Sequence, residues 1–396
     1  MRRIALLLCL LISIGVVAQT RTPETPLVVW LPDNLVVGSE ATLKLFREQA
    51  DAFGEAEGIT IDLRVKKVAD VGSILSTLRS ASAVAPNALP TLTLLNRQDL
   101  MTAWQEDLIV PLQGIIPSDL LEQVADTRKL CQINGEFAGI PYLMEVILVA
   151  YRATDNVDYA QWDYGNFIAR GEPLVFAGNT NIGLNSIVFS QYATSSNTVD
   201  AGNTLTYSES ALRDLLTFYE QARQNTLITE GNINYTASSE YLEQLALDKR
   251  QQYVVTSTEY LRARQDDATL LPAGIPSTDD TPQSILDGWC WVIVTPNEAQ
   301  QRHAAQFIAS LENDQLLVSM ALSTSMLPAN PALLSEVVGT RDDELFTRLL
   351  QNARVLLLDP ESMILERAIQ TSFQGIVSGS LTVDEAIASV ESQIGN

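Results

Sequence analysis

The sequence predicts an α/β protein with two lobes, and three observations support this prediction. Strand, helix, strand, helix and strand follow one another over residues 27–95, which is the order that builds a parallel sheet with right-handed crossovers. A second series of strands and helices begins at about residue 146. The chain has 396 residues, of which 46% are hydrophobic, and this length exceeds what one ordinary core accommodates.

The first eighteen residues predict a secretory signal peptide. Arg2 and Arg3 precede an apolar run over residues 4–17, and the small residue Ala18 ends it. These are the three parts of a cleavable export signal, so we expect cleavage before Gln19 and a secreted or periplasmic protein. Cys9 lies inside the apolar run, so it does not predict a lipoprotein. No later apolar stretch reaches the 18 residues that suggest a membrane span.

The first series of elements starts with an apolar strand at residues 27–31, which ends in a polar loop at Asp33 and Asn34. A helix with one apolar stripe is predicted over residues 40–57, followed by a strictly alternating, half-exposed strand at 59–66. A second helix at 71–84 and a third strand at 92–95 complete the series.

The second series is preceded by a hairpin. Asn134 and Gly135 lie between two short apolar runs, a strong signal for a two-residue β-turn. Strands are then predicted at 146–151, 174–177, 253–256 and 289–294, with helices at 208–224 and 297–313. Thr382 followed by Glu385 predicts a capping box that opens the last helix.

Composition excludes several classes of function. The formal net charge is −23, which argues against binding to nucleic acid or anionic lipid. With His303 as the only histidine, a zinc-type site is not expected, and neither is a metal or cofactor of another kind. Cys131 and Cys290 remain after cleavage, and both lie in apolar segments. Buried free thiols are the preferred interpretation, although an oxidising compartment also permits a disulfide.

Motifs of catalysis are missing from the chain. It has no G-x-S-x-G elbow, no Walker loop and no G-x-G-x-x-G after a strand. A pair of carboxylates among its 48 acidic residues could form a glycosidase site, but the sequence cannot test their separation. An exported, acidic, two-lobed chain without a nucleophile or metal cluster favours binding over reaction.

The order of these segments resembles extracellular solute-binding protein family 1, the maltose-binding-like receptors of ABC importers. Residues 134–142 (NGEFAGIPY), with Glu145 and the Tyr151-Arg152 pair, are most similar to the family, in which this hairpin leads across a hinge. Residues 288–294 (GWCWVIV) and 325–329 (SMLPA) look like the two later crossings. The chain departs from the family after residue 151 and before residue 253, where the family's helix start and glycine are absent.

The resemblance implies a periplasmic-binding-protein-like fold of type II, with a cleft between its lobes. We expect lobe 1 to comprise residues 26–144 and 288–328, and lobe 2 to comprise 145–287 and 329–396. It implies a monomeric, non-enzymatic receptor that closes by a hinge on a sugar or oligosaccharide and delivers it to the membrane permease subunits of an ABC transporter.

Candidate ligand-binding residues share a position at strand ends or crossings, and they are aromatic or polar, as sugar faces and hydroxyls require. They are Asp33, Asn34, Asn96, Arg97, Tyr142, Glu145, Asn179, Tyr260 and Trp289. Each also has a plain structural interpretation, as core, hinge or loop. Two other functions remain open: an exported glycoside hydrolase, marked by a sheet-end carboxylate pair of raised pKa, and a ligand sensor for a signalling partner.

Overall fold

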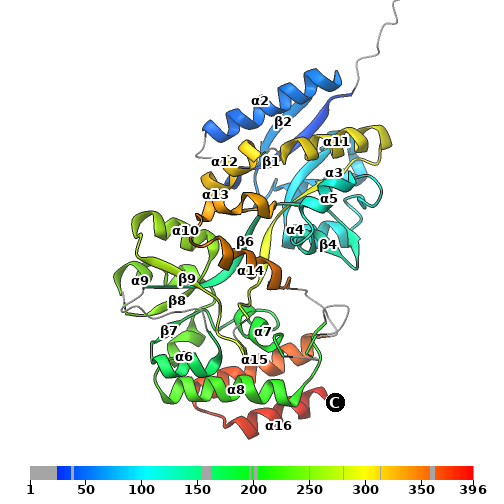
Figure 1. Ribbon diagram of the computed structural model, residues 1–396. Coiled ribbons are helices and arrows are strands. Elements are labelled where there is room, and N and C mark those ends of the chain that lie inside the picture. The colour runs from blue at the N-terminus through cyan, green and yellow to red at the C-terminus, as the bar shows by residue number, and fades with distance from the viewer. Residues whose placement is uncertain are drawn as a thin grey trace, which may run out of the picture.

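The computed structural model describes residues 25–36, 40–152, 162–195, 198–199, 204–248, 250–279, 281–312, 314–356 and 362–395. The signal peptide predicted at residues 1–18 lies outside these ranges. Figure 1 shows two lobes of strands and helices that are joined through the long strand β6 (Ile140–Arg152). Among the described residues, no helix combines the length and the apolar character that a membrane span requires.

Apart from β4 (Gln132–Ile133) and β5 (Glu136–Phe137), which pair with each other as the hairpin predicted at Asn134 and Gly135, the strands form one mixed sheet in the order β2-β1-β3-β10-β6-β8-β7, with β9 and β11 also paired to β6. Their bounds are β1 Leu27–Pro32, β2 Ile61–Lys66, β3 Leu92–Asn96, β7 Leu174–Val175, β8 Gln252–Thr256, β9 Leu270–Ala273, β10 Leu286–Ile293 and β11 Leu327–Pro328. As predicted, β1 pairs in parallel with β2 and with β3. Strand β10 returns antiparallel between β3 and β6.

Helices cover the sheet in both lobes. They are α1 Asp33–Val36, α2 Glu40–Glu57, α3 Ile74–Val84, α4 Arg97–Gln105, α5 Ser118–Gln123, α6 Tyr164–Arg170, α7 Ser186–Tyr192, α8 Glu209–Gln224, α9 Leu242–Leu247, α10 Ser257–Asp266, α11 Glu298–Leu311, α12 Asp314–Thr324, α13 Leu334–Val338, α14 Asp343–Asn352, α15 Met363–Ser378 and α16 Val383–Ile394. In the upper lobe of Figure 1, α2, α11 and α12 pack together, whereas α4 contacts β3 and β10.

The alternation of side chains along the strands explains this arrangement. Trp291 and Ile293 of β10 join the core that holds Phe46 of α2 and Phe307 of α11. The residue between them, Val292, joins the opposite core beneath α3 and α4. Because successive residues of a strand point to opposite faces, a continuous apolar run such as residues 289–294 must lie between two helical layers.

Most predicted elements are confirmed, and two begin later than expected. Helix α3 begins at Ile74 because Ser73 caps it, accepting a hydrogen bond from the backbone N–H of Ser76. Strand β2 begins at Ile61 because the backbone N–H of Ile59 donates to the carbonyl of Gly54 and closes the end of α2. The capping box of Thr382 and Glu385 at α16 is confirmed.

Strand β6 belongs to both lobes, and its ladder partners change halfway along it. Residues up to Val146 pair with β10, and residues from Ile147 pair with β8. At the change, the N–H of Val146 donates to the hydroxyl of Ser257 at 3.1 Å, and the N–H of Ile147 donates to that of Ser284 at 2.8 Å. Serine side chains therefore satisfy backbone donors at the junction of the lobes.

A buried carboxyl group lies in the core of the upper lobe. Glu312 follows α11, and neither of its carboxyl oxygens has a hydrogen-bond partner. Burial raises the pKa of Glu312 to about 8. The hydroxyl of Tyr142 on β6 is also buried without a partner, and the pKa of this phenol is raised well above its usual value by burial and by the charge of Glu312.

Candidate functional site

A cavity of about 300 Å³ lies where the carboxyl ends of β1 and β3 meet β6, β10 and the start of α10. It is lined by Asn34, Leu35, Asn96, Glu145, Thr258, Arg262, Asp287, Gly288, Trp289, Thr324 and Met326. The carboxyl ends of parallel strands are where α/β sheets bind ligands, because loops and helix N-termini converge there. The cavity therefore has the position expected of a binding site.

The sheet positions the upper wall of the cavity. Asn34 lies in α1, directly after β1, and its side chain is exposed. Asn96 ends β3 and caps α4, accepting a hydrogen bond from the N–H of Asp99 at 2.8 Å. Trp289 on β10 lies opposite Asn96 in the ladder and is 8% exposed. An aromatic ring and two amides thus surround one space.

Two carboxylates face each other in this cavity. Glu145 on β6 and Asp287 on β10 are directly opposite partners in the antiparallel ladder. Burial raises the pKa of Glu145, and the charge of Asp287 acts in the same direction, against the hydroxyls of Thr258 and Thr256. Burial also raises the pKa of Asp287, whereas the N–H of Gly288 and the charge of Arg97 lower it. Opposite like charges destabilise a sheet, which is typical of a functional site rather than a structural one.

Gly288 allows β10 to approach β6 closely behind these carboxylates. Its φ is +151°, and a β-carbon placed on it would lie 2.2 Å from the carbonyl oxygen of Leu143. The ladder register also shifts between Trp289 and Cys290, which marks a β-bulge beside the site.

Replacing Gly288 by alanine is expected to lower the free energy of unfolding by about 2–3 kcal/mol, because two strands must separate to admit the methyl group. Denaturant unfolding measures this change. Gly135→Ala is the control: Gly135 has a φ of +81° but no atom within 4 Å of an added β-carbon. Equal losses in the two variants would contradict the argument from close packing.

Four of the nine predicted site residues line the cavity, namely Asn34, Asn96, Glu145 and Trp289. Three others in the upper lobe and the crossing do not. The carboxylate of Asp33 accepts hydrogen bonds from the N–H groups of Asn34 and Val68. Tyr142 is fully buried against Trp291. Arg97 is buried behind the cavity wall.

The two remaining candidates belong to the other lobe and make structural contacts. Tyr260 is fully buried, and its hydroxyl donates to the carboxylate of Asp342 at 3.2 Å. The side-chain oxygen of Asn179 accepts hydrogen bonds from the N–H of Thr180 and the amide of Gln374. The structure thus gives both residues a role in their local fold and places neither in this cavity.

The sequence did not predict the contribution of Asp287, Thr258, Arg262 or Thr324 to the cavity. Asp287 could have been selected from the sequence, because it is a charged residue that directly precedes Gly288 and a buried strand. Thr258 and Arg262 belong to α10, which follows β8, and their approach to β1 and β3 depends on how the lobes meet.

A larger hollow of about 670 Å³ lies at the opposite end of β1 and β3. Its lining includes four prolines, and its one titratable side chain among the described residues is that of His303. It lies away from the carboxyl ends of the parallel strands. Among the described residues, no group of three His, Cys, Asp or Glu side chains gathers as a metal site.

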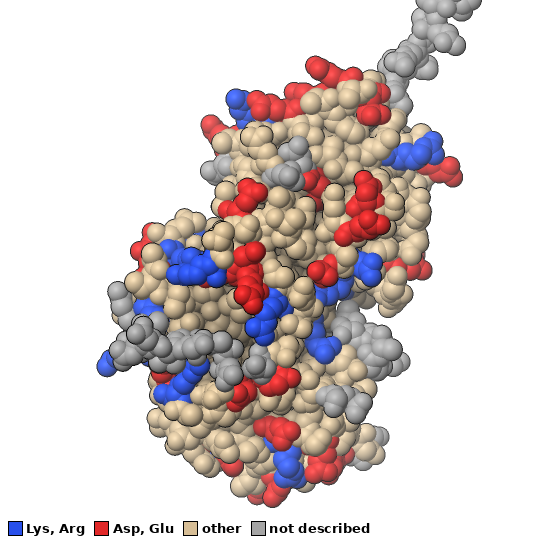
Figure 2. All heavy atoms as spheres, in the orientation of Figure 1, with Lys and Arg blue, Asp and Glu red and all other residues tan. Residues whose placement is uncertain are grey.

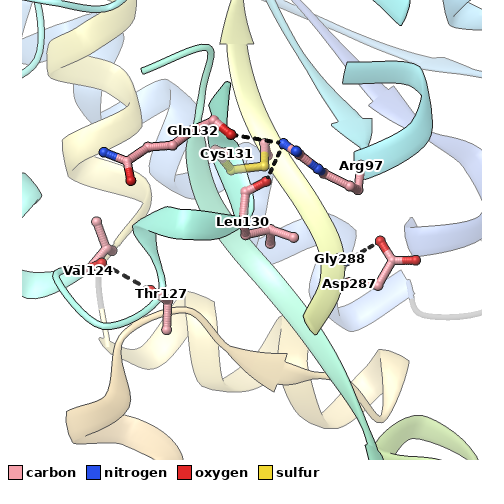
Figure 3. Close-up of a disulfide and its surroundings, with 9 residues drawn as sticks. Arg97, Val124, Thr127, Leu130, Cys131, Gln132, Asp287 and Gly288 are labelled. Carbon is pink, nitrogen blue, oxygen red and sulfur yellow. Dashed lines mark hydrogen bonds between the residues drawn. A yellow bond between two sulfur atoms is a disulfide. The ribbon is translucent and has the colours of Figure 1, made fainter. Parts of the chain in front are cut away.

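Cys131 and Cys290 form a disulfide, which corrects the preferred interpretation of these residues as free thiols. As Figure 3 shows, Arg97 reaches toward the carbonyl oxygens on either side of Cys131. One guanidinium nitrogen donates to Leu130 at 2.9 Å and to Gln132 at 3.3 Å. Burial lowers the pKa of Arg97 to about 10. The Cys131–Cys290 disulfide and the hydrogen bonds of Arg97 together hold residues 130–132 against β10, next to the cavity wall.

Comparison with known proteins identifies similar sequences and folds. The family model of the bacterial extracellular solute-binding proteins matches residues 48–347. No curated protein sequence matches this chain.

Solved structures share the fold at low identity. The cyclic α-maltosyl-1,6-maltose binding protein of Arthrobacter globiformis is 14% identical with a TM-score of 0.67, over 93% of this chain and 98% of its own. A family 1 extracellular solute-binding protein of Bifidobacterium longum subsp. infantis is 15% identical with a TM-score of 0.68, over 94% and 100%. The GacH receptor of Streptomyces glaucescens, solved unliganded and with acarbose, is 16% identical with a TM-score of 0.62, over 93% and 97%.

Proposed function

Because the chain belongs to the bacterial extracellular solute-binding proteins, we propose that it is the extracytoplasmic receptor of an ABC importer. It binds a sugar or short oligosaccharide in the cavity between its lobes, outside the cytoplasm. The observation that carries the proposal is the set of side chains around this cavity: the Trp289 ring, the amides of Asn34 and Asn96, and the carboxylates of Glu145 and Asp287.

These side chains suit a polyhydroxylated ligand. An aromatic ring stacks on the apolar face of a sugar, and carboxylates and amides accept or donate hydrogen bonds with its hydroxyls. The cavity draws its walls from β1, β3 and β10 on one side and from α10 on the other. A ligand that contacts both walls favours the closed arrangement of a two-lobed protein, because only that arrangement offers all the contacts. Structural relatives named for maltose derivatives and acarbose support the choice of sugar.

The proposal is tested first by a thermal-shift screen of the mature chain with monosaccharides, maltooligosaccharides, polyols, polyamines and peptides. We expect a sugar to raise the melting temperature. If peptides alone do so, the sugar assignment is wrong and the family membership stands. Loss of cellular uptake of that sugar when the gene is deleted then tests the role in import.

Asn34→Ala is expected to weaken the affinity for this sugar by about tenfold, because a hydrogen bond with an exposed amide at the cavity is lost. Calorimetry measures the change. The matched control is Asn87→Ala, since Asn87 lines the larger hollow at the opposite end of the sheet. If Asn87→Ala weakens binding and Asn34→Ala does not, the ligand occupies the other hollow.

A second candidate function follows from the facing carboxylates. A pair with raised pKa at the end of a sheet is also the arrangement of a glycoside hydrolase, with one carboxyl as acid and the other as nucleophile or base. Release of reducing sugar or nitrophenol from glycoside substrates tests it. Turnover that Glu145→Gln abolishes would favour the hydrolase, and binding without turnover favours the receptor.

A further inference from the structure

The carboxylates of Glu145 and Asp287 belong to directly opposite residues of a sheet, where like charges are destabilising. Directly opposite residues on antiparallel strands have β-carbons about 4.5–5.5 Å apart. Both side chains line the cavity, at the junction of β6 and β10. Amide groups such as those of Asn34 and Asn96 would serve a neutral sugar equally well without this repulsion.

The protein offsets the charge of this pair only in part, through the charge of Arg97, which acts on Asp287. No ion pair among the described residues joins Glu145 or Asp287 to a cation. The guanidinium of Arg97 donates to the carbonyls beside the disulfide, and in Figure 3 it points toward them and away from the Asp287 carboxylate. Arg262 is exposed at the rim of the cavity and donates to the carbonyl of Thr324 at 3.0 Å.

A ligand of matching charge would remove the repulsion. A protonated amine carries three N–H donors in a compact group, and charge-assisted hydrogen bonds to carboxylates are stronger than those of hydroxyls. Trp289, two residues after Asp287 on β10, also lines the cavity, and an aromatic ring attracts a cation as well as a sugar. A metal ion fits less well, because no third His, Cys, Asp or Glu side chain joins the pair among the described residues.

We propose that the ligand is an amino sugar, whose protonated amine lies between the carboxylates of Glu145 and Asp287. This inference rests on the proposed function and narrows its substrate class. The raised pKa of Glu145 agrees with it, since burial and the charge of Asp287 both act on this carboxyl group.

Calorimetry of the mature chain at neutral pH tests the inference with matched ligands. Glucosamine, N-acetylglucosamine and glucose differ at one position, and the corresponding disaccharides extend the series. We expect the free amine to bind about tenfold or more tightly than the acetylated and hydroxyl forms. Asp287→Asn and Glu145→Gln should each reduce this preference. Glu55→Gln on α2, which removes an equal charge from an exposed helix position, should preserve it.

The outcomes separate the two proposals. Equal or tighter binding of the neutral sugars overturns the amino-sugar inference and leaves the sugar receptor intact. A preference for the amine that survives both carboxylate substitutions also overturns it. Binding of spermidine or Ca²⁺, with no binding of any sugar or amino sugar, overturns the inference together with the sugar assignment.

Discussion

Replacing both Cys131 and Cys290 by alanine is expected to lower the free energy of unfolding by about 3–5 kcal/mol. The disulfide joins residues 159 positions apart, and it therefore restricts a long stretch of the unfolded chain. A long closed loop gives a large entropic stabilisation in the chain-entropy model. Both cysteines are fully buried in the folded protein, so the two alanines also leave a small space behind.

Guanidinium unfolding of the wild-type chain with and without reductant measures this effect. Reductant should bring the wild-type protein close to the stability of the double variant, and it should leave the double variant unchanged. A wild-type protein that keeps its full stability after complete reduction would show that the disulfide contributes nothing. Because the bond lies beside the cavity wall, sugar affinity measured on the same samples reports whether it also positions Trp289.

Glu312→Gln is expected to stabilise the protein increasingly as the pH rises. The folded pKa of Glu312, about 8, is above the usual value of 4.5, so the folded state binds a proton that the unfolded state has released. The Glu312 carboxyl therefore costs the folded state nothing below pH 4.5. As the pH rises toward 8, it lowers the free energy of unfolding progressively. By linkage, the variant should gain about 4–5 kcal/mol over the wild type above pH 8 and almost nothing near pH 4.5.

Denaturant unfolding at several pH values between 4.5 and 9 checks this prediction. Glu298→Gln is the matched control, because Glu298 is exposed in the first turn of the same helix, α11. Its difference from the wild type should not grow with pH in the same way. The difference in free energy of unfolding between wild type and Glu312→Gln could instead stay constant with pH. The carboxyl group would then be ionised in the folded state, and the prediction would be wrong.

Local patterns predicted the fold well, because they depend on neighbours in the sequence. The helix over residues 40–57 and the capping box at Thr382 follow from periodicity and side-chain chemistry within a few residues. The long strand β6 was only partly predicted. Pro141, which has no N–H to donate, and the charged Glu145 interrupt its apolar pattern, and the strand continues because β10, β8, β9 and β11 pair with it.

The site was harder to predict, since it depends on contacts between distant segments. A strand-end position was enough to select Asn34 and Asn96. It did not distinguish Glu145, which lines the cavity, from Tyr142, whose side chain turns into the core three residues earlier. The register that places Asp287 opposite Glu145 joins residues 142 positions apart and has no local signal.

Acidic and basic side chains are distributed differently over the surface. Figure 2 shows acidic side chains over both lobes on the face in view, with basic side chains mainly near the middle, where the lobes meet. The lobe boundaries predicted after residues 144, 287 and 328 remain a proposal.

Ser257 and Ser284, which lie against the middle of β6, allow the junction between the lobes a change of angle. A strand that is bonded on both sides resists bending, but it can twist about its long axis. Where the ladder changes partners, the N–H groups of Val146 and Ile147 point at the hydroxyls of Ser257 and Ser284. A hydroxyl rotates about its own bonds and can follow an amide through a change of angle. The lobe rotation that the proposed function requires would therefore leave both backbone donors with a partner.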